Sequence, residues 1–199
     1  LTQVTVDPYD ESSYTPMKVV GRVMNAEEAK EEEAKGNFVV KEGEGYRRIV
    51  AAPKPVAIVE IDAIRALADA DQPVIAAGGG GIPVMEQGSH LKGASAVIEK
   101  DRAAGLLAKE LDADVLMFIT GVPNVVLNYG SDHPINIDKM TTADAARYAE
   151  EGHFKTGSML PKVESSIDFI NAGKGRRAII TSLDGAKSAL AGKGGTTIQ

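Results

Sequence analysis

The sequence predicts an α/β protein in which a mainly parallel sheet is covered by helices on both faces. Continuous apolar runs at residues 115–119 and 178–180 are typical of strands buried on both faces. These runs alternate with segments whose apolar residues recur at helical spacing, and this alternation favours a three-layer α/β/α sandwich. Glycine contributes 21 of the 199 residues, above the roughly 7% share of average proteins. That excess predicts tight turns or close approaches of the backbone to a ligand.

Residues 1–52 are the most polar part of the chain, and we expect them to form a small protruding subdomain, or flap. Asn25 and Glu28 have the spacing of a capping box, and Gly36 is a typical residue for the end of the helix that follows. So few large apolar residues occur here that the segment is not expected to be a self-sufficient domain. The predicted elements are a strand over 2–6, a helix over 26–35, and strands over 38–41 and 47–51.

Residues 53–199 form the second predicted region, and Pro53 and Pro55 mark its beginning. A short apolar strand over 74–77 is expected to run directly into four glycines, and a hairpin over 83–91 is expected to follow. Ligands of such α/β proteins bind beyond the carboxyl ends of the strands. The predicted helices of this region cover residues 61–70, 101–111, 141–150, 158–171 and 184–190.

The composition excludes several classes of protein. A net charge of -6 argues against a general nucleic-acid binder, which would usually be basic. The absence of cysteine excludes disulfides, thiolate metal sites and a cysteine nucleophile. The three histidines match no metal motif, so we predict no metal-ligating residues. No apolar stretch is long enough for a bilayer, and the residues after Leu1 lack the order of a signal peptide. A cytoplasmic protein without membrane contact is therefore expected.

The run of Gly78, Gly79, Gly80 and Gly81 is the most unusual local feature. Glycines let the backbone approach an anion closely and direct N–H groups toward it. The spacing matches neither the P-loop nor the dinucleotide-binding fingerprint. The alternative is a simple turn into the hairpin. A turn rarely needs four consecutive glycines, so we favour an anion site.

Lysines near two predicted helix starts are further candidates. Lys100 precedes Asp101 at the start of one helix, and from spacing alone a solvated surface pair is favoured over a functional one. Lys162 lies near the start of the helix that Ser158 is expected to cap. The helix dipole disfavours a cation there, and a bound anion would reverse this balance. Lys18, taken alone, is an unremarkable loop residue.

Together these segments closely resemble carbamate kinases, which belong to the amino-acid kinase superfamily. The resemblance covers essentially all of the 199 residues in order, and such a series is more specific than any single motif. The matching stretches are residues 45–50, 76–83, 96–101, 150–154, 157–164, 177–182 and 195–198.

The resemblance implies the amino-acid kinase fold with a small protruding subdomain, a C-terminal nucleotide-binding part and a homodimer. It also implies phosphoryl transfer between carbamoyl phosphate and ADP, giving ATP and carbamate, with Mg²⁺, in arginine metabolism. Lys100 and Lys162 would contact the phosphoryl groups, Asp101 would orient these lysines, and Lys18 would reach in from the flap. The carbamoyl phosphate would be held by Gly78, Gly79, Gly80 and Gly81. The residues near the nucleotide would be Thr120, Gly121, Val122, Tyr129, Ser158 and Met159.

The implied chemistry agrees with the residues present. Phosphoryl transfer depends on positioning and charge stabilisation more than on covalent chemistry. Carbamate is already an anionic nucleophile, so no general base is required. Lysines and backbone N–H groups can therefore stabilise the transferring phosphoryl group without a histidine or a carboxylate dyad.

Two departures from the family pattern stand out. Family members carry an N-terminal region with a further phosphate loop, so we expect this chain to correspond to about the C-terminal two-thirds and to be poorly active alone. Pro123 follows Val122, where relatives often have an acidic residue. Two alternatives stay open: a sibling kinase acting on acetylglutamate, aspartate or UMP, and a nucleotide-binding module without catalysis. The two lysines Lys100 and Lys162 argue against the second alternative.

Overall fold

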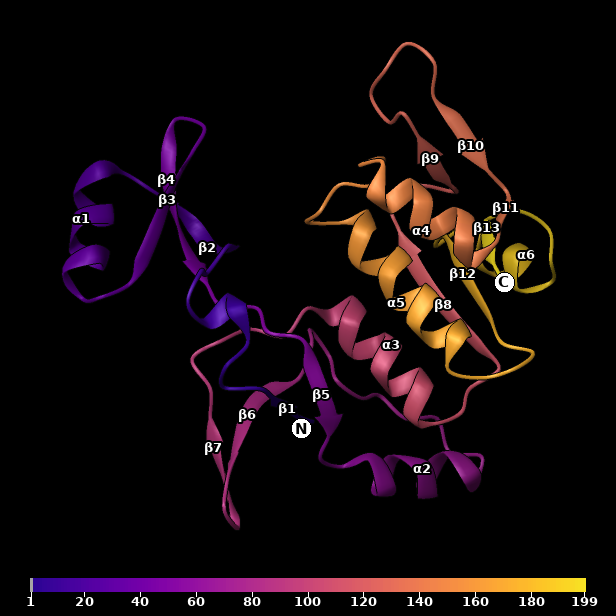
Figure 1. Cartoon of the computed structure of the whole chain (residues 1–199), viewed down its shortest axis with the longest axis horizontal. Coiled ribbons are helices and arrows are strands. Elements are labelled where there is room, and N and C mark those ends of the chain that lie inside the picture. Colours follow the sequence, from indigo (N-terminus) through magenta and orange to yellow (C-terminus); the bar gives the residue numbers. More distant parts are fainter. Residues whose placement is uncertain (1) are drawn as a thin grey trace. The chain divides into compact units, whose positions relative to one another are not determined.

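The structure is a computed structural model that describes residues 2–199, and it confirms the predicted α/β class. The chain folds into two compact units. The first comprises Leu1–Glu60 and Pro73–Lys100, and the second comprises Ile61–Gln72 and Asp101–Gln199. Figure 1 labels the helices and strands of both units. The predicted boundary after residue 52 concerns a smaller subdomain and stays a prediction.

The first unit contains a four-stranded sheet in the order β5-β1-β6-β7. Strand β1 pairs antiparallel with β5 and parallel with β6, and β6 and β7 form the predicted hairpin. Val4 on the central strand β1 is fully buried. The strands are β1 (Gln3–Val6), β5 (Pro55–Ile58), β6 (Ile82–Gln87) and β7 (His90–Gly93).

Strand β1, predicted as part of the flap, pairs instead with β5 and β6. The rest of the flap lies within the first unit and consists of an antiparallel sheet in the order β2-β4-β3, with helix α1 against β3 and β4. Its elements are η1 (Glu11–Ser13), β2 (Lys18–Met24), α1 (Ala26–Ala34), β3 (Phe38–Glu42) and β4 (Gly45–Val50). Ala29 is the buried residue of α1. The helix therefore depends on contacts at its ends and on its surface more than on packing.

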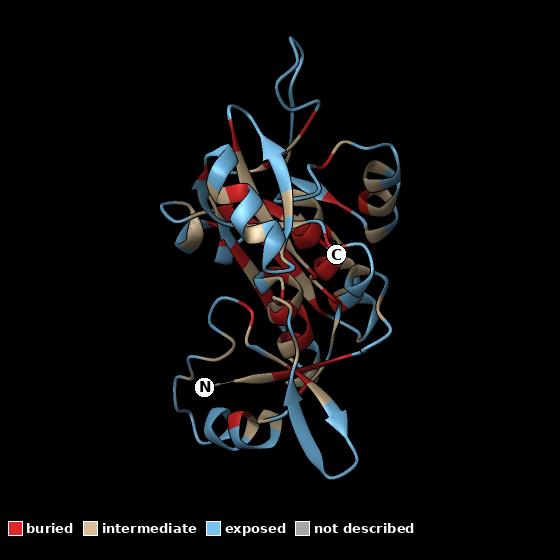
Figure 2. Ribbon diagram, turned by 90° about the vertical axis from the view of Figure 1, so that its left-hand side faces the viewer, coloured by how far each residue is buried: buried red, intermediate tan, exposed pale blue. Residues whose placement is uncertain are grey.

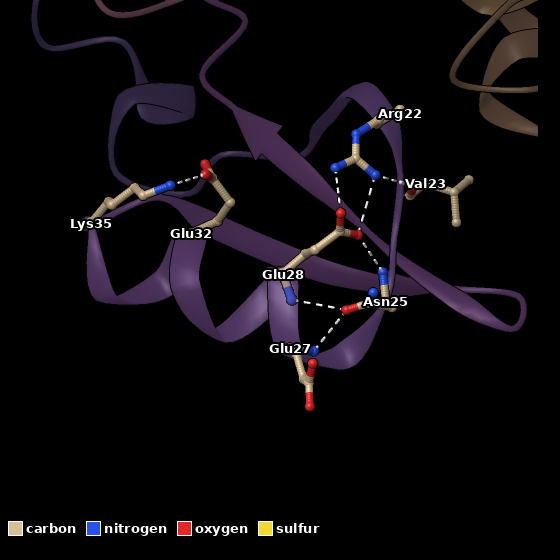
Figure 3. Close-up of polar contacts among 7 residues, drawn as sticks. All are labelled: Arg22, Val23, Asn25, Glu27, Glu28, Glu32 and Lys35. Carbon is tan, nitrogen blue, oxygen red and sulfur yellow. Dashed lines mark hydrogen bonds and ion pairs between the residues drawn. The ribbon is translucent and has the colours of Figure 1, made fainter.

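Figure 3 shows these contacts at the start of α1, and they confirm the predicted capping box. The Asn25 side chain accepts hydrogen bonds of 2.9 Å from the backbone N–H groups of Glu27 and Glu28. The Glu28 carboxylate in turn accepts from the Asn25 backbone at 2.9 Å and pairs with Arg22. The hydrogen bonds from Arg22 and from the Asn25 backbone lower the pKa of Glu28.

The second unit is built on a sheet in the order β11-β13-β12-β8 and a separate β9-β10 ribbon. Strands β8 and β12 pair in parallel over six residues, from Arg177 opposite Val115 to Ser182 opposite Thr120. The predicted pair of buried strands is thereby confirmed. The strands are β8 (Val115–Thr120), β9 (Val125–Leu127), β10 (Ile135–Ile137), β11 (Lys139–Met140), β12 (Arg177–Ser182) and β13 (Thr196–Ile198).

Helix α5 packs against β8 and β12 in this unit, and α6 also packs against β12. The centre of the core is fully buried and belongs to the residues coloured red in Figure 2; it includes Val163, Phe169, Ala178, Ile180 and Ile198. The helices are α2 (Ile61–Asp69), α3 (Lys100–Glu110), α4 (Thr142–Glu150), α5 (Met159–Asn171) and α6 (Ala186–Leu190). Among residues 2–199, no helix has the length and apolar character needed to cross a bilayer.

The strand pairing is more mixed than a mainly parallel sheet. Parallel pairing joins β1 with β6, β11 with β13 and β8 with β12, whereas the other pairings of named strands are antiparallel. The continuous apolar runs identified β8 and β12, whereas β2, β5, β9, β10, β11 and β13 were not predicted. Such patterns do not identify the direction in which a neighbouring strand runs.

The predicted strand over residues 74–77 is wrong. This segment has no regular secondary structure, and the side chain of Ile75 is 99% exposed. Ala77 has a φ of 59°, which a strand cannot contain. The apolar residues lie instead beside a surface pocket. The glycine run therefore leads into β6, and it does not follow the carboxyl end of a strand.

Candidate functional site

A buried ion pair lies at the start of two helices of the second unit. Lys162 Nζ is 2.6 Å from Asp101 Oδ2, and the two side chains are 8% and 7% exposed. Lys162 Nζ also donates to the backbone carbonyl of Ser158 at 3.3 Å. A buried ammonium group needs such acceptors because it loses its hydration. The unfavourable position of Lys162 in the first turn of α5 is therefore offset by Asp101 in the first turn of α3.

Ser158 differs from its predicted role. It occupies the N-cap position of α5, but its side chain makes no capping hydrogen bond. Its backbone has φ of -145° and ψ of -69°, away from the extended geometry that usually accompanies a serine cap. The carbonyl of Ser158 binds Lys162 instead. The predicted N-cap position of Ser158 is confirmed, and the predicted capping hydrogen bond of its side chain is wrong.

A second lysine–carboxylate pair lies in the first unit. Lys18, the first residue of β2, pairs with Glu99, and their side chains are 31% and 12% exposed. The ammonium group of Lys100 is 4.0 Å from the other oxygen of Glu99, and its side chain is 61% exposed. Lys100 therefore pairs with Glu99, whereas Asp101 pairs with Lys162. Sequence reasoning missed Glu99 as a site residue, although it directly precedes Lys100 and Asp101 in the matching stretch.

The glycine run lines a pocket of about 540 Å³ in the first unit. Gly78, Gly79 and Gly81 lie on one wall, together with Thr2, and Ile98 lies among the other lining residues. The Thr2 hydroxyl accepts a hydrogen bond of 3.0 Å from the backbone N–H of Ala77. The run is thus both a turn into β6, as the simpler interpretation expected, and the wall of a pocket.

Two positions of the run are glycine because no side chain could be accommodated there. A Cβ at Gly80 would lie 2.1 Å from the carbonyl oxygen of Ile98, and one at Gly81 would lie 2.5 Å from Val4 Cγ2. Both residues also have positive φ angles, 138° and 92°. Gly80 therefore brings the backbone against the segment that carries Glu99, and Gly81 brings it against β1.

A comparison with known families identifies the group to which these elements belong. Residues 19–182 match the model of the Amino acid kinase family. The chain belongs to this family. The match begins directly after Lys18 and ends at the last residue of β12, so it includes the Lys162–Asp101 pair, Glu99 and the glycine run.

Individual relatives of the chain are named carbamate kinase or carbamate kinase-like protein. The chain is 48% identical to the Carbamate kinase-like protein YqeA of Escherichia coli and 46% identical to a Carbamate kinase of Clostridium perfringens. It spans 64% and 63% of these two proteins, while 100% and 99% of the chain is matched.

Solved structures confirm the amino-acid kinase fold. Carbamate kinase from Giardia lamblia bound to AMP-PNP shares 40% identity with the chain and a TM-score of 0.90, over 99% of this chain and 63% of that one. A structure from Aeropyrum pernix, titled project APE1968, gives a TM-score of 0.93 at 40% identity, over 100% and 64% of the two chains.

The residues predicted to lie near a nucleotide belong to the second unit of the chain. Thr120 is the last residue of β8, and Gly121 and Val122 follow it in a loop. Tyr129 is 76% exposed, whereas Met159 packs against the hydrophobic core at the start of α5. No ligand contact tests these roles, so they stay predictions. Among residues 2–199, no group of three or more His, Asp or Glu side chains is placed to hold a metal ion.

Proposed function

We propose that the protein of which this chain forms part is a carbamate kinase, which transfers a phosphoryl group reversibly between carbamoyl phosphate and ADP. The observation that carries the proposal is the buried ammonium group of Lys162, held by Asp101 at 2.6 Å in the first turn of α5. A helix start and a fixed cation together favour a phosphate group. Identities of 46% and 40% to proteins named carbamate kinase support the choice of substrate.

The reaction needs no protein nucleophile and no general base. A terminal oxygen of ADP attacks the phosphorus of carbamoyl phosphate, and the bond between that phosphorus and the carbamate oxygen breaks. Carbamate leaves with the electron pair, and ATP is formed. Negative charge is spread over the phosphoryl oxygens during this exchange, so fixed cations lower the barrier. Lys162 in the second unit, and Lys18 and Lys100 in the first, are the lysines proposed for this role.

The glycine-lined pocket of the first unit is proposed to take carbamoyl phosphate. Three glycines, Gly78, Gly79 and Gly81, are among its lining residues and carry no side chain that would cover the backbone from a ligand. Backbone N–H groups of such a segment can bind an anion without a charged residue. The nucleotide is assigned to the second unit, where the proposed contacts are Thr120, Gly121, Val122, Tyr129, Ser158 and Met159.

Mg²⁺ is proposed to enter with the nucleotide, where it would neutralise charge on the phosphates. Such an ion is usually bound through substrate phosphates, water and one or two carboxylates. We assign no residue of this chain to the ion and derive no step through it. A homodimer, a cytoplasmic location and a role in arginine metabolism are further parts of the proposal. Light scattering of the purified full-length protein tests the first of them.

A substrate panel with the full-length protein tests the proposed reaction. We expect ATP to form from carbamoyl phosphate and ADP, and we expect no phosphorylation of acetylglutamate, aspartate or UMP. The Lys100→Met variant tests whether a lysine takes part in the reaction, because the exposed side chain of Lys100 can be replaced without an expected effect on folding. We expect its turnover to fall about 100-fold or more.

Two results would contradict the proposal. Phosphorylation of acetylglutamate without any use of carbamoyl phosphate would identify a sibling kinase. Binding of ADP and carbamoyl phosphate in calorimetry, without turnover by the full-length protein, would identify a binding module.

A further inference from the structure

Helices α3 and α5 approach each other unusually closely at Gly105. A Cβ at this position would lie 2.8 Å from Ser165 Cβ, 3.3 Å from the Ser165 carbonyl oxygen and 3.4 Å from its Cα. Ser165 is 5% exposed and lies on the buried side of α5. Because backbone atoms and a Cβ cannot rotate away, any larger residue at position 105 would require the helices to separate.

The same two helix faces carry the buried ion pair. Asp101 precedes Gly105 by four residues on α3, so the two lie on one face one turn apart. Lys162 precedes Ser165 by three residues on α5 and also shares its face. The close contact is therefore one turn away from the Lys162–Asp101 hydrogen bond. A second pair, Arg102 with Glu164 at 2.7 Å, joins the same helices beside it.

The distances leave little tolerance for a change in helix spacing. Relief of a 2.8 Å contact to an ordinary carbon–carbon distance requires a shift of roughly 1 Å. A hydrogen bond is no longer formed at about 3.6 Å. The bond from Lys162 Nζ to Asp101 Oδ2 is 2.6 Å and joins the two helices, whereas the bond to the Ser158 carbonyl lies within α5 and its N-cap. A separation of roughly 1 Å would therefore lengthen the bond to Asp101 to about the limit at which it is lost.

Local stability alone disfavours glycine at this position. Glycine in the interior of a helix costs about 1 kcal/mol relative to alanine. Gly105 is the sixth residue of the eleven in α3, so it is neither a cap nor a helix end. The close contact with Ser165 is the feature of the structure that explains a glycine here.

We propose that Gly105 and Ser165 are positioning residues for phosphoryl transfer: they set the spacing of α3 and α5 at which Asp101 holds the ammonium group of Lys162. This inference rests on the proposed function, in which Lys162 contacts the transferring phosphoryl group. Neither residue contacts a substrate. They act through the direction and distance of the Lys162 side chain.

A compensating pair of substitutions in the full-length protein tests this role. Gly105→Ala is expected to lower kcat about 10-fold to 100-fold, because a 1 Å misplacement can cost about 100-fold in rate, and to change the KM values less. Adding Ser165→Gly to this variant removes the atom that the new Cβ meets at 2.8 Å. The double variant is therefore expected to regain most of the lost kcat. Gly93→Ala on β7, where nothing lies within 4 Å, is the matched control and should keep wild-type kcat.

Each outcome of this test decides the question. Wild-type kcat in Gly105→Ala overturns the proposal, and so does a loss that Ser165→Gly does not restore. If Gly105→Ala fails to fold, the double variant must still fold and turn over, and an unfolded or inactive double variant also overturns the proposal.

A crystal structure of the Gly105→Ala variant gives a readout that is independent of the reaction. In Gly105→Ala, the distance from Lys162 Nζ to Asp101 Oδ2 should exceed 3.5 Å, and a retained 2.6 Å bond contradicts the inference even if carbamoyl phosphate proves not to be the substrate.

Discussion

Both units of the chain contain a proposed site lysine that pairs with a carboxylate, Lys162 with Asp101 and Lys18 with Glu99, but the two pairs are in different surroundings. In the second unit, the side chains of Lys162 and Asp101 are 8% and 7% exposed, and both lie on helices that pack in the core. In the first unit, Lys18 and Glu99 are 31% and 12% exposed. One pair is removed from water, and the other still has access to it.

This difference in exposure predicts that the ammonium group of Lys162 is held in place, whereas that of Lys18 can change its partner. Breaking a buried pair leaves an uncompensated charge in the interior, which is strongly unfavourable. A lysine with access to water can exchange its carboxylate for solvent or for another anion at small cost. We therefore expect Lys162 to keep its place throughout a reaction, and Lys18 to be the lysine that can change partner when a phosphate compound binds.

The largest effect is expected from Lys162→Met. Removal of the ammonium group should abolish turnover and also destabilise the protein by about 3–5 kcal/mol, because the Asp101 carboxylate stays buried without its partner. Thermal and urea unfolding of the full-length protein measure this change. The burial of the Lys162 side chain, which is 8% exposed, is the reason for the expected loss of stability.

Two variants serve as controls for Lys162→Met. Asp101→Asn combined with Lys162→Met removes both charges, and it should be less destabilised than Lys162→Met alone. Lys100→Met makes the same change at a side chain that is 61% exposed, and surface changes of this kind stay within about 0.5 kcal/mol. Equal stability of Lys162→Met and Lys100→Met would show that the buried pair is not important for folding.

A smaller effect on stability is expected from Lys18→Met. The partly exposed pair with Glu99 should contribute below about 1 kcal/mol, and this contribution should decrease at high salt. If Lys18 contacts a phosphate during the reaction, turnover should fall by much more than stability. Unfolding in 0.1 M and 1 M salt, together with steady-state kinetics, separates the two effects. A loss of stability as large as that of Lys162→Met would erase the distinction between the two pairs.

Local signals in the sequence predicted the local structure well. The continuous apolar runs predicted β8 and β12, and the capping-box spacing of Asn25 and Glu28 predicted the start of α1. Thr141 and Asp144 form a second capping box, not predicted from the sequence, at the start of α4. These features depend on residues within one element. The wrong strand prediction at residues 74–77 also has a physical reason, because strand formation depends on a partner elsewhere in the chain. An apolar run becomes a strand only where another strand offers hydrogen bonds, and no local pattern reports that.

The site was predictable only in part because its contacts are distant in sequence. Asp101 and Lys162 are 61 residues apart, and Lys18 and Glu99 are 81 residues apart. The position of Lys162 at a helix start indicated an unusual cation, but its partner came from the family resemblance. Glu99 had no signal of its own, since a glutamate beside a lysine usually belongs to a solvated surface.

The smallest effect is expected at the surface pair of Arg22 and Glu28 on the flap, whose side chains are 71% and 34% exposed. Hydrogen bonds from Arg22 and the Asn25 backbone lower the pKa of Glu28 below 4.5. The ionised form therefore stabilises the folded state above about pH 4.5, and this stabilisation is lost as the pH falls through the lower folded-state pKa.

Arg22→Gln should raise the pKa of Glu28 toward its usual value, as an NMR titration of the side-chain carboxyl group would measure. Lys30→Gln, on the same helix but two residues away, should leave it unchanged because such neighbours do not face each other. A wild-type Glu28 that titrates at its usual value would show that this pair does not persist in water.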